Sequence, residues 1–328
     1  MQRRKTLSIA IIVLMAVSLL FAGTQPAAAA SGGGKTVKVT LNANGGTFAD
    51  GTAVQTLQMT KGQTYADIYG AAYVPVREGY AFTGWDRSKG TSETVVCIGD
   101  SLTHGELGVD GGVLLGDAQK SPVARTGALL GKGWRALNYG VGGTTSRQWA
   151  DDQNGILSNA LSAIRANRAQ VVTILLGAND ANYAYQITKK DYKSALKAVI
   201  KKVKGAGAKI VILHTPSYVD TKKPLGHAID PKLLKAYRRA VYELVAADAA
   251  VYAGADMWQI VSAAPSKFLG VDGVHFTQKG YNRAASYWTA AIRQAVLANV
   301  GRISAPYAPT SKVKAGTKRT LYAHWIRL

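Results

Sequence analysis

Two kinds of hydrophobic pattern divide the chain. Near the N-terminus, apolar and polar side chains alternate at residues 37–41 and again at residues 57–60, with the turn sequence Asn44-Gly45-Gly46 between them. Alternation of this kind predicts half-buried β-strands. Residues 80–85 and, close to the C-terminus, residues 320–325 predict two further short aromatic strands. Both ends of the chain are therefore expected to be β-rich.

Between these β-rich ends, short apolar runs alternate with amphipathic segments of helical period. Such alternation predicts an α/β fold, in which a parallel sheet carries helices on both faces. Pro231 fits the first turn of a helix and Thr277 fits a helix cap. The predicted strands cover residues 94–98, 135–138, 171–176, 209–213 and 250–252, and the predicted helices cover residues 146–168, 190–205, 231–247 and 278–299.

The first thirty residues have the three parts of a secretory signal. A charged start, Gln2-Arg3-Arg4-Lys5, precedes an apolar run from Leu7 to Ala22 and the small residues Ala27–Ala30. We expect cleavage near Ala30 and a mature protein that is secreted or held at a bacterial cell surface. An uncleaved membrane anchor is the alternative, but the run is short for spanning a bilayer and no stop-transfer pattern follows it.

Composition adds constraints on stability and on partners. The chain has 328 residues, 47% of them hydrophobic, and Cys97 is its one cysteine, so an intramolecular disulfide is excluded. The net charge is +21, and eight lysines lie between residues 187 and 209. A solvated helix face is the preferred interpretation of that cluster. Anionic cell-wall polymer or carbohydrate is a further candidate partner, whereas no nucleic-acid recognition motif is present.

One strand ends in a sequence that can carry chemistry. The apolar run at residues 94–98 stops at Gly99-Asp100-Ser101, so Ser101 is placed at the carboxyl end of a buried strand. Ligands bind at that edge of open α/β sheets. Ser101 is a nucleophile if a base reaches it, and otherwise a helix N-cap.

Three further polar motifs complete a candidate site. Asp272 and His275, three residues apart before a helix, can turn toward each other, so that the carboxylate holds the imidazole while the other ring nitrogen faces Ser101. The negative charge of a tetrahedral intermediate needs preorganised donors. The backbone N–H groups of Ser101 and Gly143 and the side-chain amide of Asn179 are the candidates.

These motifs together resemble the SGNH hydrolases, also called the GDSL esterase/lipase family. The resemblance implies a flavodoxin-like, three-layer α/β/α domain over residues 93–301, which hydrolyses esters through an acyl-enzyme without a metal or other cofactor. Position 103 is Thr, so the Gly-x-Ser-x-Gly elbow of the α/β-hydrolases is absent. The four matching blocks are Gly99-Asp100-Ser101-Leu102, Asn138 with Gly143, Gly177-Ala178-Asn179-Asp180, and Asp272 with His275.

The β-rich ends carry a second resemblance. Residues 39–46, 77–85 and 321–325 look like successive parts of one internalin-type B-repeat, a small β-grasp-like module of bacterial surface proteins. The resemblance implies a module split into residues 31–92 and 302–328 by the inserted hydrolase domain. Insertion is tolerated where the guest's termini lie close together. We therefore expect residues 321–325 to pair with N-terminal strands, the alternative being a detached C-terminal hairpin.

Other polar residues near the motifs have simpler interpretations. Asp180 is interpreted as structural, and His104 either lines a substrate pocket or is a plain loop histidine. No thiol cluster or His-Glu-x-x-His pair predicts a metal site. Residues 127–133 lack the spacing and the final Ser or Thr of a phosphate-binding loop.

The sequence thus predicts a secreted serine esterase. Because no long apolar loop indicates an interfacial lid, short acyl groups such as acetyl, on carbohydrate or cell-wall glycan, are the expected substrates. A lysophospholipase or lipase acting on lipid esters is the alternative within enzymes. A non-catalytic surface adhesion protein is the alternative outside them.

Overall fold

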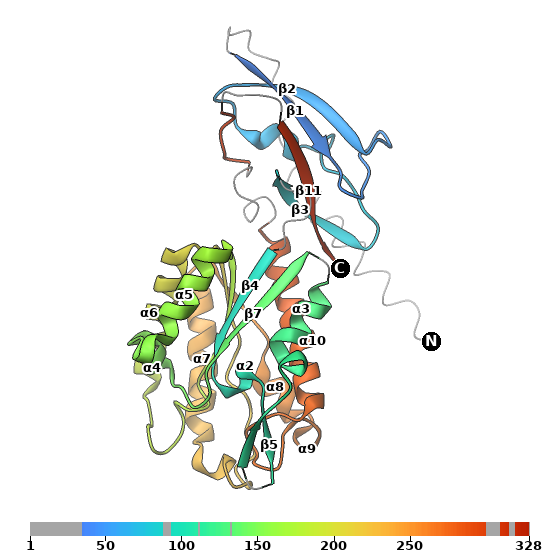
Figure 1. Cartoon of the computed structure of the whole chain (residues 1–328). Helices are drawn as coiled ribbons and strands as arrows, with labels where there is room; N and C mark the ends of the chain where they lie inside the picture. Colours follow the sequence, from blue (N-terminus) through green and yellow to red (C-terminus); the bar gives the residue numbers. More distant parts are fainter. Residues whose placement is uncertain are drawn as a thin grey trace. The chain divides into compact units, whose positions relative to one another are not determined.

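The computed structural model describes residues 35–87, 93–110, 112–131, 133–299, 309–314 and 319–327 (Figure 1). The predicted signal sequence, residues 1–30, lies outside them. The described residues fall into two compact units, one within Met1–Lys89 and Val300–Trp325 and the other within Gly90–Asn299 and Ile326–Leu328.

The first unit is built on a four-stranded sheet. Its strands, in spatial order, are β2 (Val54–Thr60), β1 (Thr36–Asn42), β11 (Arg319–Arg327) and β3 (Tyr80–Asp86). Strand β1 runs antiparallel to β2 and parallel to β11, with Val39 opposite Arg319 and Asn42 opposite Tyr322. The predicted pairing of residues 321–325 with N-terminal strands is therefore confirmed.

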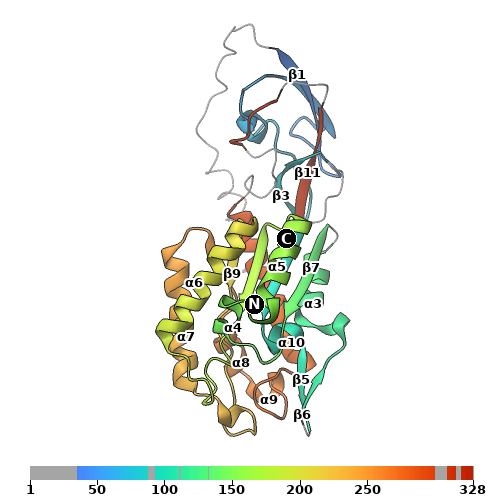
Figure 2. The ribbon, with the colours of Figure 1, turned by 60° about the vertical axis from the view of Figure 1, so that its left-hand side comes forward.

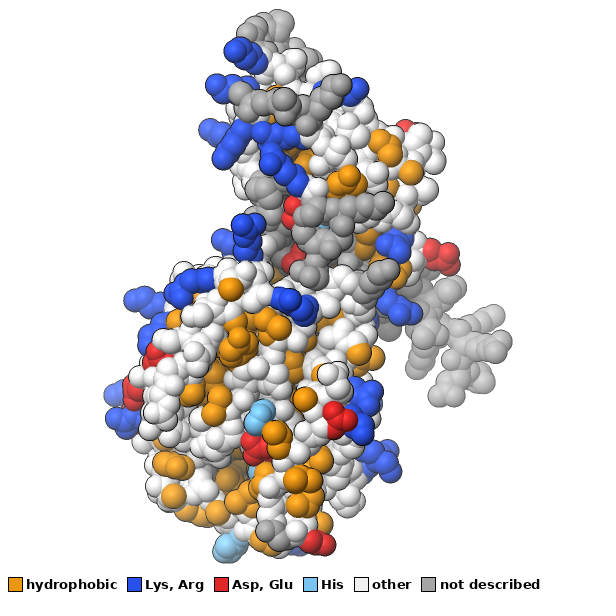
Figure 3. Space-filling model, in the orientation of Figure 1, with side chains coloured by type: hydrophobic (Ala, Val, Ile, Leu, Met, Phe, Trp, Pro, Cys, Tyr) orange, Lys and Arg blue, Asp and Glu red, His pale blue; other side chains and the backbone are white. Residues whose placement is uncertain are grey.

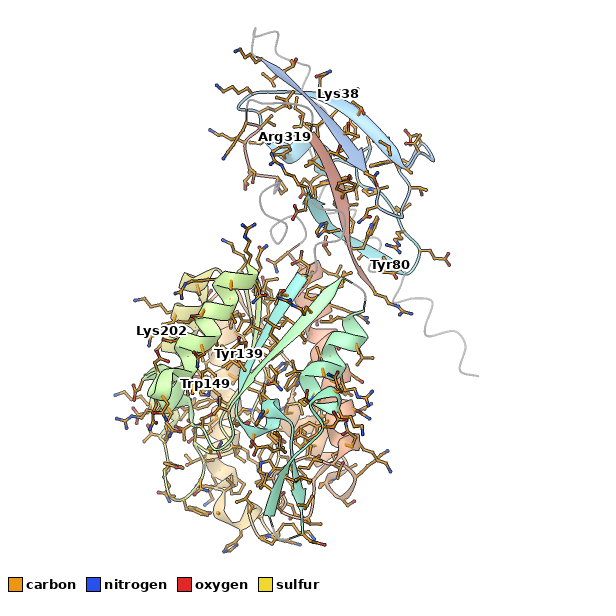
Figure 4. The ribbon with its side chains drawn as sticks, viewed as in Figure 1. Lys38, Tyr80, Tyr139, Trp149, Lys202 and Arg319 are labelled. Carbon is orange, nitrogen blue, oxygen red and sulfur yellow. The ribbon has the colours of Figure 1, made fainter. Side chains whose placement is uncertain are left out.

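Aromatic side chains fill the core of this β-rich unit. The rings of Phe82 and Trp85 meet edge to face with centroids 5.2 Å apart, and Trp325 approaches Phe82 at 5.9 Å. The indole N–H of Trp85 donates to the carbonyl of Ile68, in the 3₁₀ helix η1 (Tyr65–Tyr69), at 3.0 Å. In Figure 4, the labels Lys38, Tyr80 and Arg319 mark β1, β3 and β11.

The second unit contains a five-stranded, fully parallel sheet. Such sheets are buried on both faces, which explains the continuous apolar runs in the sequence. In β4, Val96 and Ile98 belong to the core beneath the helices on one face of the sheet, and Cys97 is also fully buried. The spatial order of the strands is β10 (Val251–Ala253), β9 (Ile210–Leu213), β8 (Val171–Leu175), β4 (Glu93–Gly99) and β7 (Trp134–Gly140).

Helices cover both faces of this sheet and give three layers (Figures 1 and 2). One face carries α5 (Ile156–Asn167), α6 (Lys189–Ala206) and α7 (Pro231–Ala247), and the other carries α3 (Pro122–Leu130) and α10 (Gln278–Leu297). The predicted α/β class, with a separate β-rich unit, is confirmed. Shorter helices α2 (Ser101–His104), α4 (Ser146–Ala150), α8 (Met257–Ser262) and α9 (Pro265–Phe268) lie in the connections.

The prediction of a single helix over residues 146–168 is wrong. The segment forms α4 and α5, separated by a left-handed turn in which Asp152 and Asn154 have φ +54° and Gly155 has φ +74°. Asn, Asp and Gly tolerate this conformation better than other residues, so the chain can break here without interrupting the apolar stripe. Trp149, on the short helix α4, packs into the core of the unit (Figure 4).

A β-hairpin follows α2 that hydrophobic periodicity did not predict. Its strands are β5 (Glu106–Val109) and β6 (Gly112–Leu115), which pair antiparallel.

Among the described residues, no helix combines the length and the hydropathy needed to cross a membrane.

Candidate active site

Three strand ends meet at one edge of the parallel sheet. Gly99, the last residue of β4, lies opposite Gly140 at the end of β7 and opposite Leu175 at the end of β8. The segments that carry Ser101, Gly143 and Asn179 therefore leave the sheet side by side. Carboxyl ends of adjacent parallel strands form the usual ligand site of such sheets.

Local turn chemistry explains how Ser101 is presented. The Asp100 side chain accepts the Leu102 N–H at 3.0 Å, so Asp100 is the N-cap and Ser101 the first residue of α2. A Cβ on Gly140 would lie 2.2 Å from the backbone nitrogen of His104. Glycine at that position therefore allows α2 to pass directly over the end of β7.

Asn138 anchors the other end of this turn. Its side-chain N–H₂ donates to the carbonyl of His104 at 3.1 Å, and its side-chain oxygen accepts the Gly140 N–H at 2.9 Å. Asn138 thus links β7 to α2, the short helix that begins at Ser101.

The structure brings Ser101, His275 and Asp272 together. His275 Nε2 lies 2.9 Å from Ser101 Oγ, and His275 Nδ1 lies 2.7 Å from Asp272 Oδ2. All three side chains are buried. A hydroxyl, an imidazole and a carboxylate in this order can carry a proton from the hydroxyl to the ring while the carboxylate fixes the ring's tautomer.

The loop before α10 holds the carboxylate and the ring in place. Asp272 Oδ1 accepts the backbone N–H groups of Val274 at 2.9 Å and His275 at 3.0 Å. The carbonyl of Asp272 accepts the N–H groups of Leu225 and Gly226. Burial raises the pKa of Asp272, but the hydrogen bonds from His275 and Val274 outweigh it and the net pKa lies below 3.8. Asp272 is therefore charged at neutral pH.

The three candidate oxyanion donors surround the same edge. Ser101 contributes the first N–H of α2, which has no partner within the helix. Gly143 adopts φ +74°, a conformation that favours glycine, in the turn after β7. The Asn179 amide donates to the carbonyl of Thr144 at 2.9 Å, which places the amide beside the Gly143 turn.

Asp180 has contacts that fit the structural interpretation. It is fully buried and accepts the Ser146 N–H at 3.0 Å, together with the Ser146 hydroxyl. Burial raises its pKa to about 6. The carboxylate joins the end of β8 to the start of α4, and so supports the segment that carries Asn179.

Glu106 was missed by sequence reasoning. Its Oε1 lies 2.9 Å from His104 Nδ1, and its Oε2 lies 4.0 Å from His275 Nε2. A Cβ on Gly142 would lie 2.2 Å from Glu106 Oε1, so the carboxylate also rests against the turn that carries Gly143. The sequence signal was the lone acid directly after the Ser101 motif. His104, the last residue of α2, contacts Glu106.

An apolar cavity lies beside Asp272. It has a volume of about 520 Å³. Hydrophobic side chains gather on this face of the unit, in the region of β5 (Figure 3). On the neighbouring strand β6, Leu114 and Leu115 are 56% and 58% exposed. The apolar residues lining the cavity are Val109, Val113, Pro224, Leu225 and Val271.

Within the part of the chain that the structure describes, no group of three or more His, Cys, Asp or Glu side chains is arranged to hold a metal ion.

Comparison with known families identifies the protein's class. The model of the GDSL-like lipase/acylhydrolase family matches residues 97–283. This is more than half of the chain, so the chain belongs to that family. It is an SGNH-type carboxylic ester hydrolase, as the first resemblance implied.

Solved structures share the fold of the hydrolase unit. An aryl esterase from M. smegmatis is 19% identical, with a TM-score of 0.51, and the match covers 62% of this chain and 99% of that one. Est24, a carbohydrate acetylesterase from Sinorhizobium meliloti, gives the same identity, TM-score and coverage. A carbohydrate acetylesterase family member, also from S. meliloti, is 14% identical, with a TM-score of 0.50, and the match covers 62% of this chain and 99% of that one. No curated protein sequence matches the chain.

Proposed function

We propose that this protein is a serine esterase in which Ser101, His275 and Asp272 form the catalytic triad. The observation that carries the proposal is the unbroken contact from Asp272 through His275 to Ser101 Oγ. Ser101 Oγ attacks the ester carbonyl while His275 Nε2 takes its proton, and His275 then gives that proton to the departing alcohol. Water, activated by the same ring, hydrolyses the acyl-enzyme.

Three N–H donors stabilise the tetrahedral oxyanion in this proposal. They are the backbone groups of Ser101 and Gly143 and the side chain of Asn179. The hydrogen bond from Asn179 to the Thr144 carbonyl supports this assignment, because it fixes the amide and leaves its second N–H for substrate. Removing one such donor lowers kcat on the order of a hundredfold or more.

Short acyl groups on carbohydrate or cell-wall glycan remain the proposed substrates. Tyr183 and Tyr185 are more than half exposed, in the loop that follows Asn179. Tyrosine offers both an apolar ring face and a hydroxyl, which suits the mixed surface of a sugar. Two structures with this fold are described as carbohydrate acetylesterases, but that is an analogy of fold alone.

The hairpin favours a second candidate, a lysophospholipase or lipase. Val113, Leu114 and Leu115 are exposed on β6, and an apolar cavity lies beside Asp272. These features could receive an acyl chain longer than acetyl. The sequence predicted no interfacial lid and therefore short acyl groups. The exposed apolar residues of β6 and the cavity beside Asp272 are the main structural argument against an enzyme restricted to such short groups.

One assay series tests both substrate proposals. Ser101→Ala should abolish hydrolysis of p-nitrophenyl acetate while the circular dichroism spectrum stays unchanged. Wild-type activity in that variant refutes the assignment of Ser101 as nucleophile, whereas a wild-type protein that hydrolyses no ester of the series favours the adhesion alternative. A chain-length series of p-nitrophenyl esters then separates the two enzymes: an acetate optimum, with acetate release from acetylated glycan, supports the carbohydrate esterase, and an optimum at eight carbons or longer supports the lipase.

We propose that the protein works outside the cell, after cleavage near Ala30. The charged, apolar and small-residue order of residues 1–30 supports secretion, and the N-terminal mass of the secreted protein tests it. The likeness of the β-rich unit to an internalin-type B-repeat, split by residues 93–301, remains part of this proposal. It rests on the sequence blocks and on the β1–β11 pairing.

The basic surface of α6 supports an anionic wall polymer as partner. Lys190, Lys197 and Lys201 are exposed at spacings that place them on one helix face. By contrast, Lys189 and Lys193 form ion pairs with Glu243. Co-sedimentation with purified cell walls, weakened by salt and by replacing the three exposed lysines with glutamine, supports this partner; unchanged binding contradicts it.

A further inference from the structure

One carboxylate oxygen of Glu106 lies near His275 and receives no hydrogen bond from the described part of the protein. Oε1 is held by His104 Nδ1 at 2.9 Å. Oε2 accepts no hydrogen bond from any residue that the structure describes, and it lies 4.0 Å from His275 Nε2. The Glu106 side chain is 19% exposed, so the carboxylate is largely removed from water but still open to a ligand.

The backbone of Glu106 is fixed from two directions. Glu106 opens β5 and pairs with Leu115 of β6, and its carbonyl accepts the hydroxyl of Tyr281 from α10. Gly142 leaves the space that the carboxylate fills. A side chain held in this way is preorganised to bind a partner with little loss of conformational freedom.

The charge of Glu106 favours a substrate that carries a hydrogen-bond donor close to Oε2. A carboxylate near a developing oxyanion repels it, so an unpaired Glu106 opposes the first step of ester hydrolysis. A hydroxyl or ammonium group on the substrate would pair with Oε2 and offset that repulsion. In the proposed mechanism, His275 Nε2 hands its proton to the leaving alcohol, so the group next to Nε2 faces the alcohol side of the ester.

We infer that Glu106 is a specificity-determining residue that accepts a hydrogen bond from a donor on the alcohol part of the substrate, such as the hydroxyl next to an esterified sugar oxygen. This inference rests on the proposed function of Ser101 and His275. In this role, Glu106 selects polyol esters over esters of simple alcohols. The inference therefore deepens the carbohydrate proposal and disfavours substrates whose alcohol part has no hydrogen-bond donor.

A matched pair of substrates isolates this contact. The esters 2-hydroxyethyl acetate and 2-methoxyethyl acetate share the acyl group and the length of the alcohol up to its second oxygen, and only the first offers a donor. Wild type should prefer the hydroxyethyl ester in kcat/KM by roughly tenfold or more, as expected for a hydrogen bond to a charged acceptor. Glu106→Leu should lower that preference to about one, and Glu106→Gln, which keeps a neutral acceptor, should give an intermediate value.

Controls separate this inference from other roles of Glu106. Asp117→Asn removes another carboxylate, about half exposed and ion-paired with Lys120, and should keep the wild-type preference. If wild type shows no preference, or if Glu106→Leu slows both esters equally, Glu106 does not read the alcohol and the inference is overturned. The absence of a preference in the wild type overturns the inference even if Glu106→Leu fails to fold, and Glu106→Gln, which keeps the size and shape of the side chain, then tests whether an observed preference depends on the charge of Glu106. If Ser101→Ala hydrolyses both esters at the wild-type rate, the proposed function itself fails instead.

Discussion

His275 Nε2 lies 2.9 Å from Ser101 Oγ although 174 residues separate the two in the chain. Ser101 reaches this point from the end of β4, and His275 reaches it from the loop before α10. The contact depends on the Asp100 cap at one end and on the Asp272 turn at the other. Each of these supports can be removed separately.

Asp272→Asn should lower kcat for p-nitrophenyl acetate by about 10²- to 10⁴-fold. An asparagine N–H₂ facing His275 Nδ1 favours the tautomer whose proton lies on Nε2, and that ring cannot accept the proton of Ser101. Asp220→Asn is the control, because Asp220 is a loop carboxylate that accepts the Lys222 N–H outside the triad. Its unfolding temperature and kcat are measured alongside those of Asp272→Asn. Activity of Asp272→Asn within threefold of wild type contradicts the orienting role.

Asp100 should make stability depend on pH. Burial raises its pKa from 3.8 to about 7, so between these values the folded protein keeps a proton that the unfolded chain has released. The contribution of Asp100 to the free energy of unfolding is therefore greatest below pH 3.8, falls as pH rises, and is smallest above pH 7. The full loss has an upper limit of about 4 kcal/mol.

Asp100→Asn tests this dependence, because asparagine caps helices as well as aspartate does and carries no charge. Urea unfolding at pH 4.5, 6 and 8 should show the wild type losing stability relative to the variant as pH rises. A difference between the two proteins that is the same at all three pH values contradicts the prediction.

Asp180 and Ser146 should be energetically coupled. Asp180→Ala leaves the buried N–H and hydroxyl of Ser146 without their acceptor and should lower the free energy of unfolding by about 1–3 kcal/mol. Ser146→Ala removes only the hydroxyl and should cost about 1 kcal/mol. The double variant should lose less than the sum of the two. Strictly additive losses would show that the contact contributes nothing to stability.

Leu321 should be essential to the β-rich unit. Its side chain is fully buried in the aromatic core, and β11 lies between β1 and β3. Leu321→Ala should lower the free energy of unfolding of this unit by about 2–5 kcal/mol and speed its cleavage in limited proteolysis. Thr320→Ala, on the exposed position just before it, is the matched control. Equal cleavage rates in the two variants would contradict a core role.

Much of the site could be predicted because its parts are local. The run into Gly99-Asp100-Ser101 and the three-residue spacing of Asp272 and His275 are properties of short segments, in which turn chemistry and hydrophobic period dominate. The break after α4 could not be found in the same way. Asn154 and Gly155 adopt left-handed conformations there, while the apolar stripe continues on both sides.

The sequence by itself determined the α/β class, the strand ends and the residue types available for ester hydrolysis, because these follow from period and local turn preference. Only the tertiary structure decided which side chains share the site. Glu106 meets His275 and the Gly142 turn at the start of β5, where the Tyr281 hydroxyl of α10 donates to the Glu106 carbonyl. Contacts between residues so far apart in the chain depend on packing, and local sequence preference does not encode them.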